Sequence, residues 1–217
     1  DDARNALKGP TDTPKDKSTD RGFAGGNTDQ RENAMLALSS SFPEDTTPLS
    51  GINYLDIHDN WALADQFATH DWDGRWGVDE ANYKIAAVML YTSMGPIVTH
   101  GGSEMMRSKG LAELKETVKE TTSGTKVFLH GKRDTYNMRA ANNFIWENVG
   151  KNKKEEDTFC DYKEMYAFWQ GLNKFRLSPY GKVFRTAEIV PADYYQWILP
   201  DNRHMLGYLV DKKVMVL

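Results

Sequence analysis

Apolar side chains recur at helical spacing in two segments of the chain. Between Asp79 and Thr92 they stand at Ala81, Ile85, Val88 and Met89, and Asp79 is placed to cap the first turn. Asp161 with Glu164 predicts a capping box for a second helix. The apolar face of that helix comprises Tyr162, Met165, Tyr166, Trp169 and Leu172, and Pro179 marks its end.

Two short apolar runs predict strands on either side of the first helix. Ile52–Ile57 follows Pro48 and Gly51, and Ile97–Thr99 follows the break at Gly95-Pro96. The order strand, loop, helix, strand is a βαβ pattern, so these strands are expected to run parallel.

The remaining segments carry weaker patterns. Residues 1–33 are polar and predict a loop, followed by a short helix over Glu32–Leu38. Residues 110–131 predict a surface excursion with a short amphipathic helix whose apolar residues are Leu111, Leu114 and Val118. Beyond residue 180 the period changes, and strands are expected over Val183–Val190, Met205–Val210 and Val214–Leu217, with the last two joined as a hairpin across residues 211–213.

Composition narrows the classes of function. The 217 residues carry 27 Lys and Arg against 31 Asp and Glu, and this charge of −4 without a basic block argues against nucleic-acid binding. No apolar run is long enough for a membrane span, and Cys160 alone allows neither a disulfide framework nor a thiolate metal site. Six Trp and ten Tyr, mostly in polar segments, suit ligands such as sugars that have both apolar faces and hydroxyls.

The tripeptide His58-Asp59-Asn60 is the main candidate for chemistry. It follows directly after the predicted strand Ile52–Ile57, and substrates of parallel α/β enzymes bind at the carboxyl ends of strands. His70, His130 and His204 have no partners at metal-ligand spacing, so no metal site is expected. Nucleotide-binding glycine motifs are absent from the sequence.

Several sequence blocks stand in the order found in one known family. They are Asp1 to Gly9 with Gly22-Phe23, Asn53-Tyr54 with His58-Asp59-Asn60, Tyr91 to Glu104 with Arg107-Ser108-Lys109, Asp134 to Asn137 with Asn143 and Trp146, and Gly171 to Arg176 with Pro179 and Phe184-Arg185. Through these blocks the chain resembles the α-amylase superfamily of retaining glycoside hydrolases, in its pullulanase-like, starch-debranching branch. Met138-Arg139 departs from the Pro-Asp that often stands there, and Ser103 departs from the usual Gly-Glu-Glu run.

The resemblance implies an α/β fold, the C-terminal portion of a (β/α)8 TIM barrel followed by the start of an all-β sandwich. Residues 1–179 would form the last part of the barrel, with the excursion at 110–131, and residues 180–217 an incomplete β-sandwich domain. The missing N-terminal barrel portion would be a partner, either in the same chain or as a second polypeptide. Secreted, cell-surface or periplasmic locations fit the implied substrate class.

The resemblance also implies roles for individual residues. Asp59 would stabilise the transition state, His58 would bind a hydroxyl of the same sugar, and Asn60, Tyr136 and Asn137 would line the neighbouring wall. A retaining glycosidase needs a nucleophile and an acid/base carboxyl group, and both would lie outside these residues. The chain alone is therefore expected to be inactive.

The implied substrate is an α-glucan, cleaved at α-1,6 links without an organic cofactor, and any structural calcium would lie elsewhere in the full enzyme. The alternatives are an α-1,4-acting amylase or branching transferase of the same superfamily, and a non-catalytic glucan-binding fragment.

Overall fold

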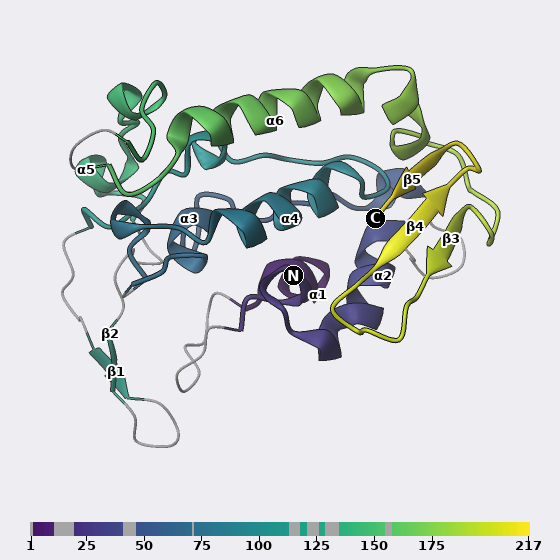
Figure 1. The fold of residues 1–217 in the computed structure, drawn as a ribbon, viewed down its shortest axis with the longest axis horizontal. Helices are drawn as coiled ribbons and strands as arrows, with labels where there is room; N and C mark the ends of the chain where they lie inside the picture. The colour runs from purple at the N-terminus through teal and green to yellow at the C-terminus, as the bar shows by residue number, and fades with distance from the viewer. Residues whose placement is uncertain are drawn as a thin grey trace.

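The computed structural model describes the chain except for residues 1, 11–19, 41–46, 71, 113–117, 121–125, 129–134 and 155–157. Two long helices, α4 and α6, lie side by side along the molecule, and α1 packs against both α4 and α2 (Figure 1). The α-helices are α1 Asp2–Lys8, α2 Arg31–Ser39, α3 Leu63–Gln66, α4 Glu80–Tyr91, α5 Arg139–Asn142 and α6 Tyr162–Leu177. The strands are β1 Val118–Glu120, β2 Lys126–Phe128, β3 Tyr195–Ile198, β4 Gly207–Val210 and β5 Val214–Val216.

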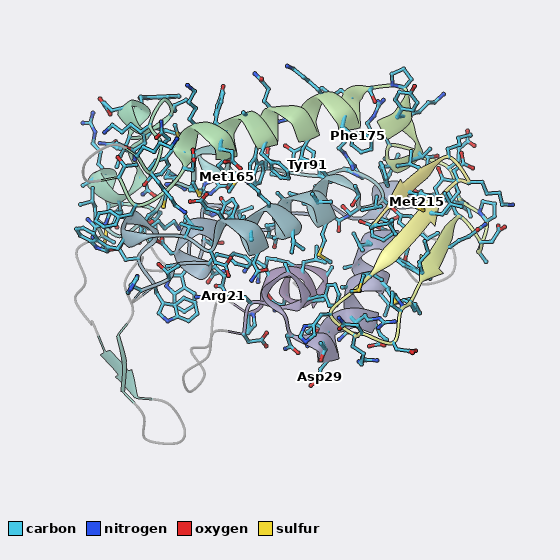
Figure 2. All side chains as sticks on the ribbon, in the orientation of Figure 1. Arg21, Asp29, Tyr91, Met165, Phe175 and Met215 are labelled. Atoms are coloured by element: carbon cyan, nitrogen blue, oxygen red, sulfur yellow. The ribbon has the colours of Figure 1, made fainter. Side chains whose placement is uncertain are left out.

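The two helices predicted from apolar spacing are confirmed. The Asp79 side chain accepts a hydrogen bond from the backbone N–H of Asn82 at the start of α4, and Asp161 accepts one from Glu164 at the start of α6. The facing sides of the helices carry Tyr91 and Met165 (Figure 2). The caps therefore mark both helix starts correctly, although the capping box is half formed, because the Asp161 N–H donates to Glu80. Of the predicted apolar faces, Met89 in α4 and Met165 and Trp169 in α6 are buried, whereas Ala81, Ile85 and Tyr166 are exposed.

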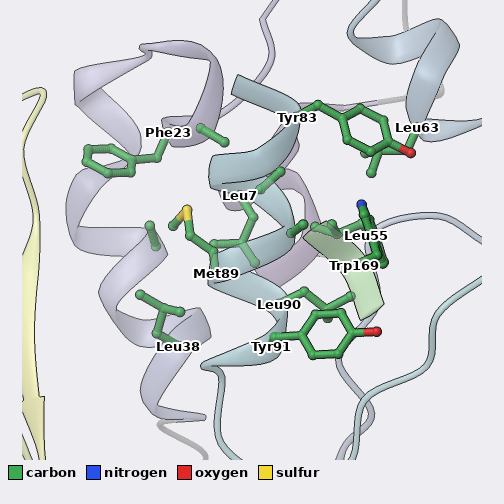
Figure 3. Packing of buried hydrophobic residues seen from close by; sticks show 14 of the residues in the cluster. Leu7, Phe23, Leu38, Leu55, Leu63, Tyr83, Met89, Leu90, Tyr91 and Trp169 are labelled. Atoms are coloured by element: carbon green, nitrogen blue, oxygen red, sulfur yellow. The ribbon is translucent and has the colours of Figure 1, made fainter. Parts of the chain in front are cut away.

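Aromatic rings hold α4 and α6 together in the core. Trp169 of α6 lies edge-on to Tyr91, with 5.7 Å between ring centroids, and 6.1 Å from Tyr83 (Figure 3). All three residues are buried, together with Leu90 of α4 and Leu38 of α2. Burying large aromatic side chains is among the strongest stabilising contributions a core receives.

The predicted parallel strands are reduced to one bridge. Asn53 pairs in parallel with Ile97, through its N–H to the carbonyl of Pro96 at 2.9 Å and its carbonyl to the N–H of Val98 at 2.8 Å. The direction of pairing therefore agrees with the prediction, but neither run is a strand. The pairing stops because the chain bends after Tyr54, and Asp56 then bonds to side chains and to a helix start instead of a neighbouring strand.

Two further predictions in the first part of the chain need correction. Residues 2–8 form α1 where a loop was expected, because Ala6 and Leu7 are buried in the core that α2 also joins. The helix expected around Leu111, Leu114 and Val118 is wrong at its end, since β1 pairs antiparallel with β2. A β-branched residue such as Val118 is better suited to a strand than to a helix. Leu114 lies outside the described residues. The helix expected over Glu32–Leu38 is confirmed as α2.

The C-terminal strands were predicted in part. The β4–β5 hairpin is confirmed, with Val210 opposite Val214 and positive φ angles at Asp211 and Lys212. A strand over Val183–Val190 is wrong, because Tyr180–Phe184 is a 3-10 helix, and β3, which pairs with β4, was missed.

This small sheet is anchored on the helical core. The Tyr195 hydroxyl donates to the carbonyl of Thr92 at 2.9 Å, and the Tyr208 hydroxyl lies 2.5 Å from the Thr92 hydroxyl. Both tyrosines are buried in the same cluster as α4 and α6. A division into domains near residue 180 stays a prediction.

Candidate functional site

The His58-Asp59-Asn60 segment is an exposed bend that lies between the bridge at Asn53 and helix α3. The side chains of His58 and Asp59 are 73% and 58% exposed, and His58 Nε2 lies 3.3 Å from Asp59 Oδ1. Asn60 has a φ of 60°, a left-handed conformation that asparagine tolerates better than most residues. An imidazole and a carboxylate are therefore presented together to solvent.

The backbone of this bend is held from beneath. The buried Lys109 ammonium donates to the carbonyl of His58 at 2.8 Å and to that of Asn60 at 2.5 Å. Trp61, the next residue, is buried with its ring centroid 4.4 Å from that of Trp72. The bend thus combines exposed functional side chains with a backbone fixed on its inner side.

Asp56 fixes the chain just before the bend. This buried carboxylate accepts hydrogen bonds from the backbone N–H of Leu63 at 2.9 Å and from the Ser103 hydroxyl at 2.8 Å, and it lies 3.7 Å from His100 Nδ1. Burial acts to raise the pKa of Asp56, but the interactions with His100, Leu63 and Ser103 outweigh it and hold the pKa below its ordinary value. Asp56 therefore stays ionised beneath the site.

A second buried carboxylate, Asp65, fixes the segment that carries Lys109. It accepts from the backbone N–H of Gly74 at 2.9 Å, from that of Lys109 at 2.8 Å, and from the Ser108 hydroxyl. Burial raises the pKa of Asp65 to about 6 despite these donors, with the neighbouring Asp73 adding to the effect.

The predicted wall residues Tyr136 and Asn137 lie in a turn just before α5. Both side chains are exposed, Tyr136 by 82%, while Thr135 beside them is buried. In the described part of the chain, no hydrogen bond or ring contact joins either side chain to His58 or Asp59. Figure 1 places α5 and α3 at the same end of the molecule.

A chain of polar contacts connects this turn to the bend. The Asn142 amide donates to the carbonyls of Thr135 and Met138, and its oxygen lies 3.5 Å from an Arg107 nitrogen. Arg107 in turn lies 3.1 Å from His100, which neighbours Asp56. The segments carrying the two groups of predicted residues are therefore linked beneath the surface, although the predicted side chains themselves do not touch.

Exposed aromatic rings lie on the segment after α5. Phe144 and Trp146 are stacked, with 5.1 Å between centroids and 18° between planes, and Trp146 is 67% exposed. Trp76 is also half-exposed and packs edge-on against Phe159. Such flat apolar faces can stack on sugar rings.

Other candidate groups have structural partners. Glu104 accepts from the backbone N–H of Gly102 at 2.9 Å, as expected of a structural carboxylate, and His70 lies 2.9 Å from the Thr69 hydroxyl. His130 lies outside the described residues.

Within the described ranges, no group of three or more His, Cys, Asp or Glu residues is arranged to hold a metal ion. Across those same ranges, the helices are all too short or too polar to cross a membrane.

The exposed residues of the site were predicted from the sequence, but the buried residues that hold the bend in place were not. Asp56 and Lys109 stand out only once their contacts are known, since neither a buried Asp nor a buried Lys has a spacing signal of its own. Lys109 belongs to a sequence block that carried the resemblance, but nothing in that block indicated which backbone groups its ammonium would bind.

No protein-family profile and no curated protein sequence matches this chain. Solved structures do match. The chain is similar to a pullulanase from Bacillus acidopullulyticus, with a TM-score of 0.62 and 22% identity over 95% of this chain and 21% of that one. It is also similar to a mutant pullulanase from Paenibacillus barengoltzii complexed with maltotriose, with a TM-score of 0.64 and 18% identity over 95% of this chain and 28% of the other.

A third match is the pullulanase of Anoxybacillus sp. LM18-11 complexed with maltotetraose, with a TM-score of 0.56 and 20% identity over 95% of this chain and 25% of that one. At this level of identity the similarity is one of fold. The chain thus has the fold of part of these pullulanases, and it spans between 21% and 28% of the length of the three structures.

Proposed function

We propose that this chain forms one wall of the active site of an α-glucan hydrolase of the pullulanase type, which cleaves α-1,6 links in pullulan, starch or glycogen. The observation that carries the proposal is the exposed His58–Asp59 pair on a bend whose backbone is held by a buried ammonium. A carboxylate with a merely structural role would be expected to accept hydrogen bonds from its own backbone surroundings, as Asp56 and Asp65 do.

In this proposal Asp59 is the third carboxylate of the site. It accepts hydrogen bonds from sugar hydroxyls and stabilises positive charge as the ring distorts toward an oxocarbenium ion. His58 donates to a hydroxyl of the same sugar. Asn60, Tyr136 and Asn137 line the adjoining wall, where an exposed tyrosine ring offers an apolar face to the glucan.

The nucleophile and the acid/base carboxyl group are proposed to lie outside these 217 residues. Retaining hydrolysis requires both groups on opposite sides of the glycosidic bond. The share of the pullulanase structures that the chain matches, 28% at most among those described above, supports this assignment. The chain alone is then inactive, and hydrolysis needs the remaining part of the barrel, in the same or a second polypeptide.

The test is an Asp59→Asn substitution in the complete polypeptide, assayed on pullulan. We expect kcat to fall by at least about 10²–10³-fold, the effect of losing one preorganised electrostatic partner. Because Asp59 is largely exposed, the free energy of unfolding should change by no more than about 0.5 kcal/mol. Asp201→Asn, at an exposed aspartate before β4, is the matched control and should leave kcat unchanged.

The outcomes separate the proposal from its alternatives. Unchanged kcat in Asp59→Asn contradicts the role given to Asp59. Binding of maltotriose without any hydrolysis by the complete polypeptide favours a non-catalytic glucan-binding protein. Hydrolysis of amylose with no action on pullulan favours an α-1,4-acting member of the superfamily.

A further inference from the structure

Lys109 is a fully buried ammonium whose hydrogen-bond partners are backbone carbonyls. In the part of the chain that the structure describes, no carboxylate lies within ion-pair distance of its Nζ. Burying a charge is costly unless hydrogen bonds and opposite charges compensate it, so such a lysine is rare in an ordinary core. The groups that the Lys109 ammonium binds therefore indicate which part of the structure the buried charge stabilises.

The two carbonyls that Lys109 binds belong to the residues on either side of Asp59. The ammonium lies 2.8 Å from the carbonyl oxygen of His58 and 2.5 Å from that of Asn60. Drawing both carbonyls to one point fixes the peptide group that precedes Asp59 and the one that follows Asn60. The Asp59 side chain remains on the exposed surface, where it contacts His58.

Lys109 is itself fixed by a buried acceptor. Its backbone N–H donates to Asp65 Oδ2 at 2.8 Å, and the Ser108 hydroxyl before it donates to Oδ1 of the same carboxylate. Asp65 also accepts from the backbone N–H of Gly74. The ammonium therefore extends from an immobilised backbone, as a group that sets the position of another residue must.

We propose that Lys109 is the positioning residue for Asp59: its buried ammonium holds the 58–60 bend so that the Asp59 carboxylate is presented to the glucan. The inference rests on the proposed function, because it names the group on which that function depends. An apolar residue of the same length would leave two carbonyls without their donor and would remove the positive charge behind the carboxylate.

The protonation state of Lys109 should be visible in the pH dependence of kcat. Burial, followed by repulsion from Arg107, lowers the pKa of Lys109 to about 8, while Asp56, Asp65 and Asp59 oppose this shift. Below that pH the ammonium donates to both carbonyls with its full charge. Above it the neutral amine is a weaker donor. We therefore expect kcat of the unmutated protein to decline as the pH rises through about 8.

The experiment compares Lys109→Met and Lys109→Arg in the complete polypeptide. Lys8→Met is the control, because Lys8 is equally buried but lies in α1 and donates to Gly9. Lys109→Met should lower kcat on pullulan by about 10²-fold, the cost of misplacing a catalytic group, and raise amide exchange in a peptide spanning 56–62. Lys8→Met should do neither, and Lys109→Arg should recover part of the activity and lack the decline near pH 8, because its guanidinium does not titrate there.

Unchanged kcat in Lys109→Met, or an equal fall in Lys8→Met, overturns the proposal. Should Lys109→Met not fold, the pH profiles decide: a decline near pH 8 in the unmutated protein that is absent in Lys109→Arg supports the proposal, and the same decline in both overturns it. An unmutated protein that neither hydrolyses pullulan nor binds maltotriose refutes the proposed function instead. Amide exchange in the 56–62 peptide then still reports whether Lys109 holds the bend.

Discussion

Replacing Arg176 should show that a buried cation links α6 to the turn after α4. Its guanidinium donates to the carbonyls of Tyr91 at 2.6 Å and Ser93 at 3.0 Å, and also to those of Gly95 and Phe184. Phe184 keeps a second donor, the backbone N–H of Gly95. In Arg176→Met, the three carbonyls of Tyr91, Ser93 and Gly95 would therefore lose the donor that they have here.

The size of the effect follows from two opposing terms. Each buried carbonyl left without a donor costs about 1–3 kcal/mol, so the three together cost about 6 kcal/mol. Burial lowers the pKa of Arg176 from 12.5 to about 10, a penalty of about 3 kcal/mol on the charged form that the substitution removes. The lost hydrogen bonds outweigh the recovered penalty, and we expect a net destabilisation of about 3 kcal/mol.

Thermal and urea unfolding followed by circular dichroism measure this change, which should lower Tm by about 6–12 °C. The matched control is Arg185→Met. Arg185 also donates to backbone carbonyls, those of Arg176, Leu177 and Ser178, but it is exposed, so water can replace it at a cost of about 1 kcal/mol or less. Equal losses in the two variants, or no loss in Arg176→Met, would refute the reasoning.

Two further predictions concern the pH dependence of stability and the backbone of the terminal hairpin. The pKa of Asp65 is raised from 3.8 to about 6, so between these pH values the folded state binds more protons than the unfolded state. Protonated Asp65 therefore adds about 3 kcal/mol to the free energy of unfolding relative to its ionised form. This contribution is present below pH 3.8 and is lost as the pH rises through 6. Urea unfolding from pH 3.5 to 7 should show this loss in the unmutated protein relative to Asp65→Asn, and parallel pH curves would contradict it. Lys212 has a φ of 54°, which glycine adopts more readily than lysine. Lys212→Gly should therefore raise the free energy of unfolding by about 0.5–1 kcal/mol in the same assay. A lower free energy of unfolding in this variant would contradict the prediction.

Local signals predicted the elements whose ends are marked in the sequence. The caps at Asp79 and Asp161 and the apolar spacing that follows them located α4 and α6, and the β4–β5 hairpin was located by two apolar runs on either side of residues 211–213. The runs at Ile52–Ile57 and Ile97–Thr99 are not strands, because the pairing between them stops at one bridge. Whether an apolar run has neighbours to pair with is a tertiary property that its own residues do not encode.

The candidate site also contains residues that the sequence indicates and residues that it does not. His58 and Asp59 could be chosen from their position after an apolar run, and their exposure on a single bend agrees with that choice. Lys109 could not, because its partners are backbone carbonyls about 50 residues away. Every residue carries the same backbone carbonyl, so the sequence does not show which carbonyls a buried side chain will bind.

The proposed function depends most on the 58–60 bend being a wall of a glucan site. Amide hydrogen exchange of the complete polypeptide, with and without maltotriose, tests this directly when read in peptides spanning 56–62 and 135–142. We expect maltotriose to slow exchange in both peptides, and Asp59→Asn to weaken the effect in the first. Unchanged exchange in both peptides at saturating maltotriose, or protection confined to other segments, would contradict the account.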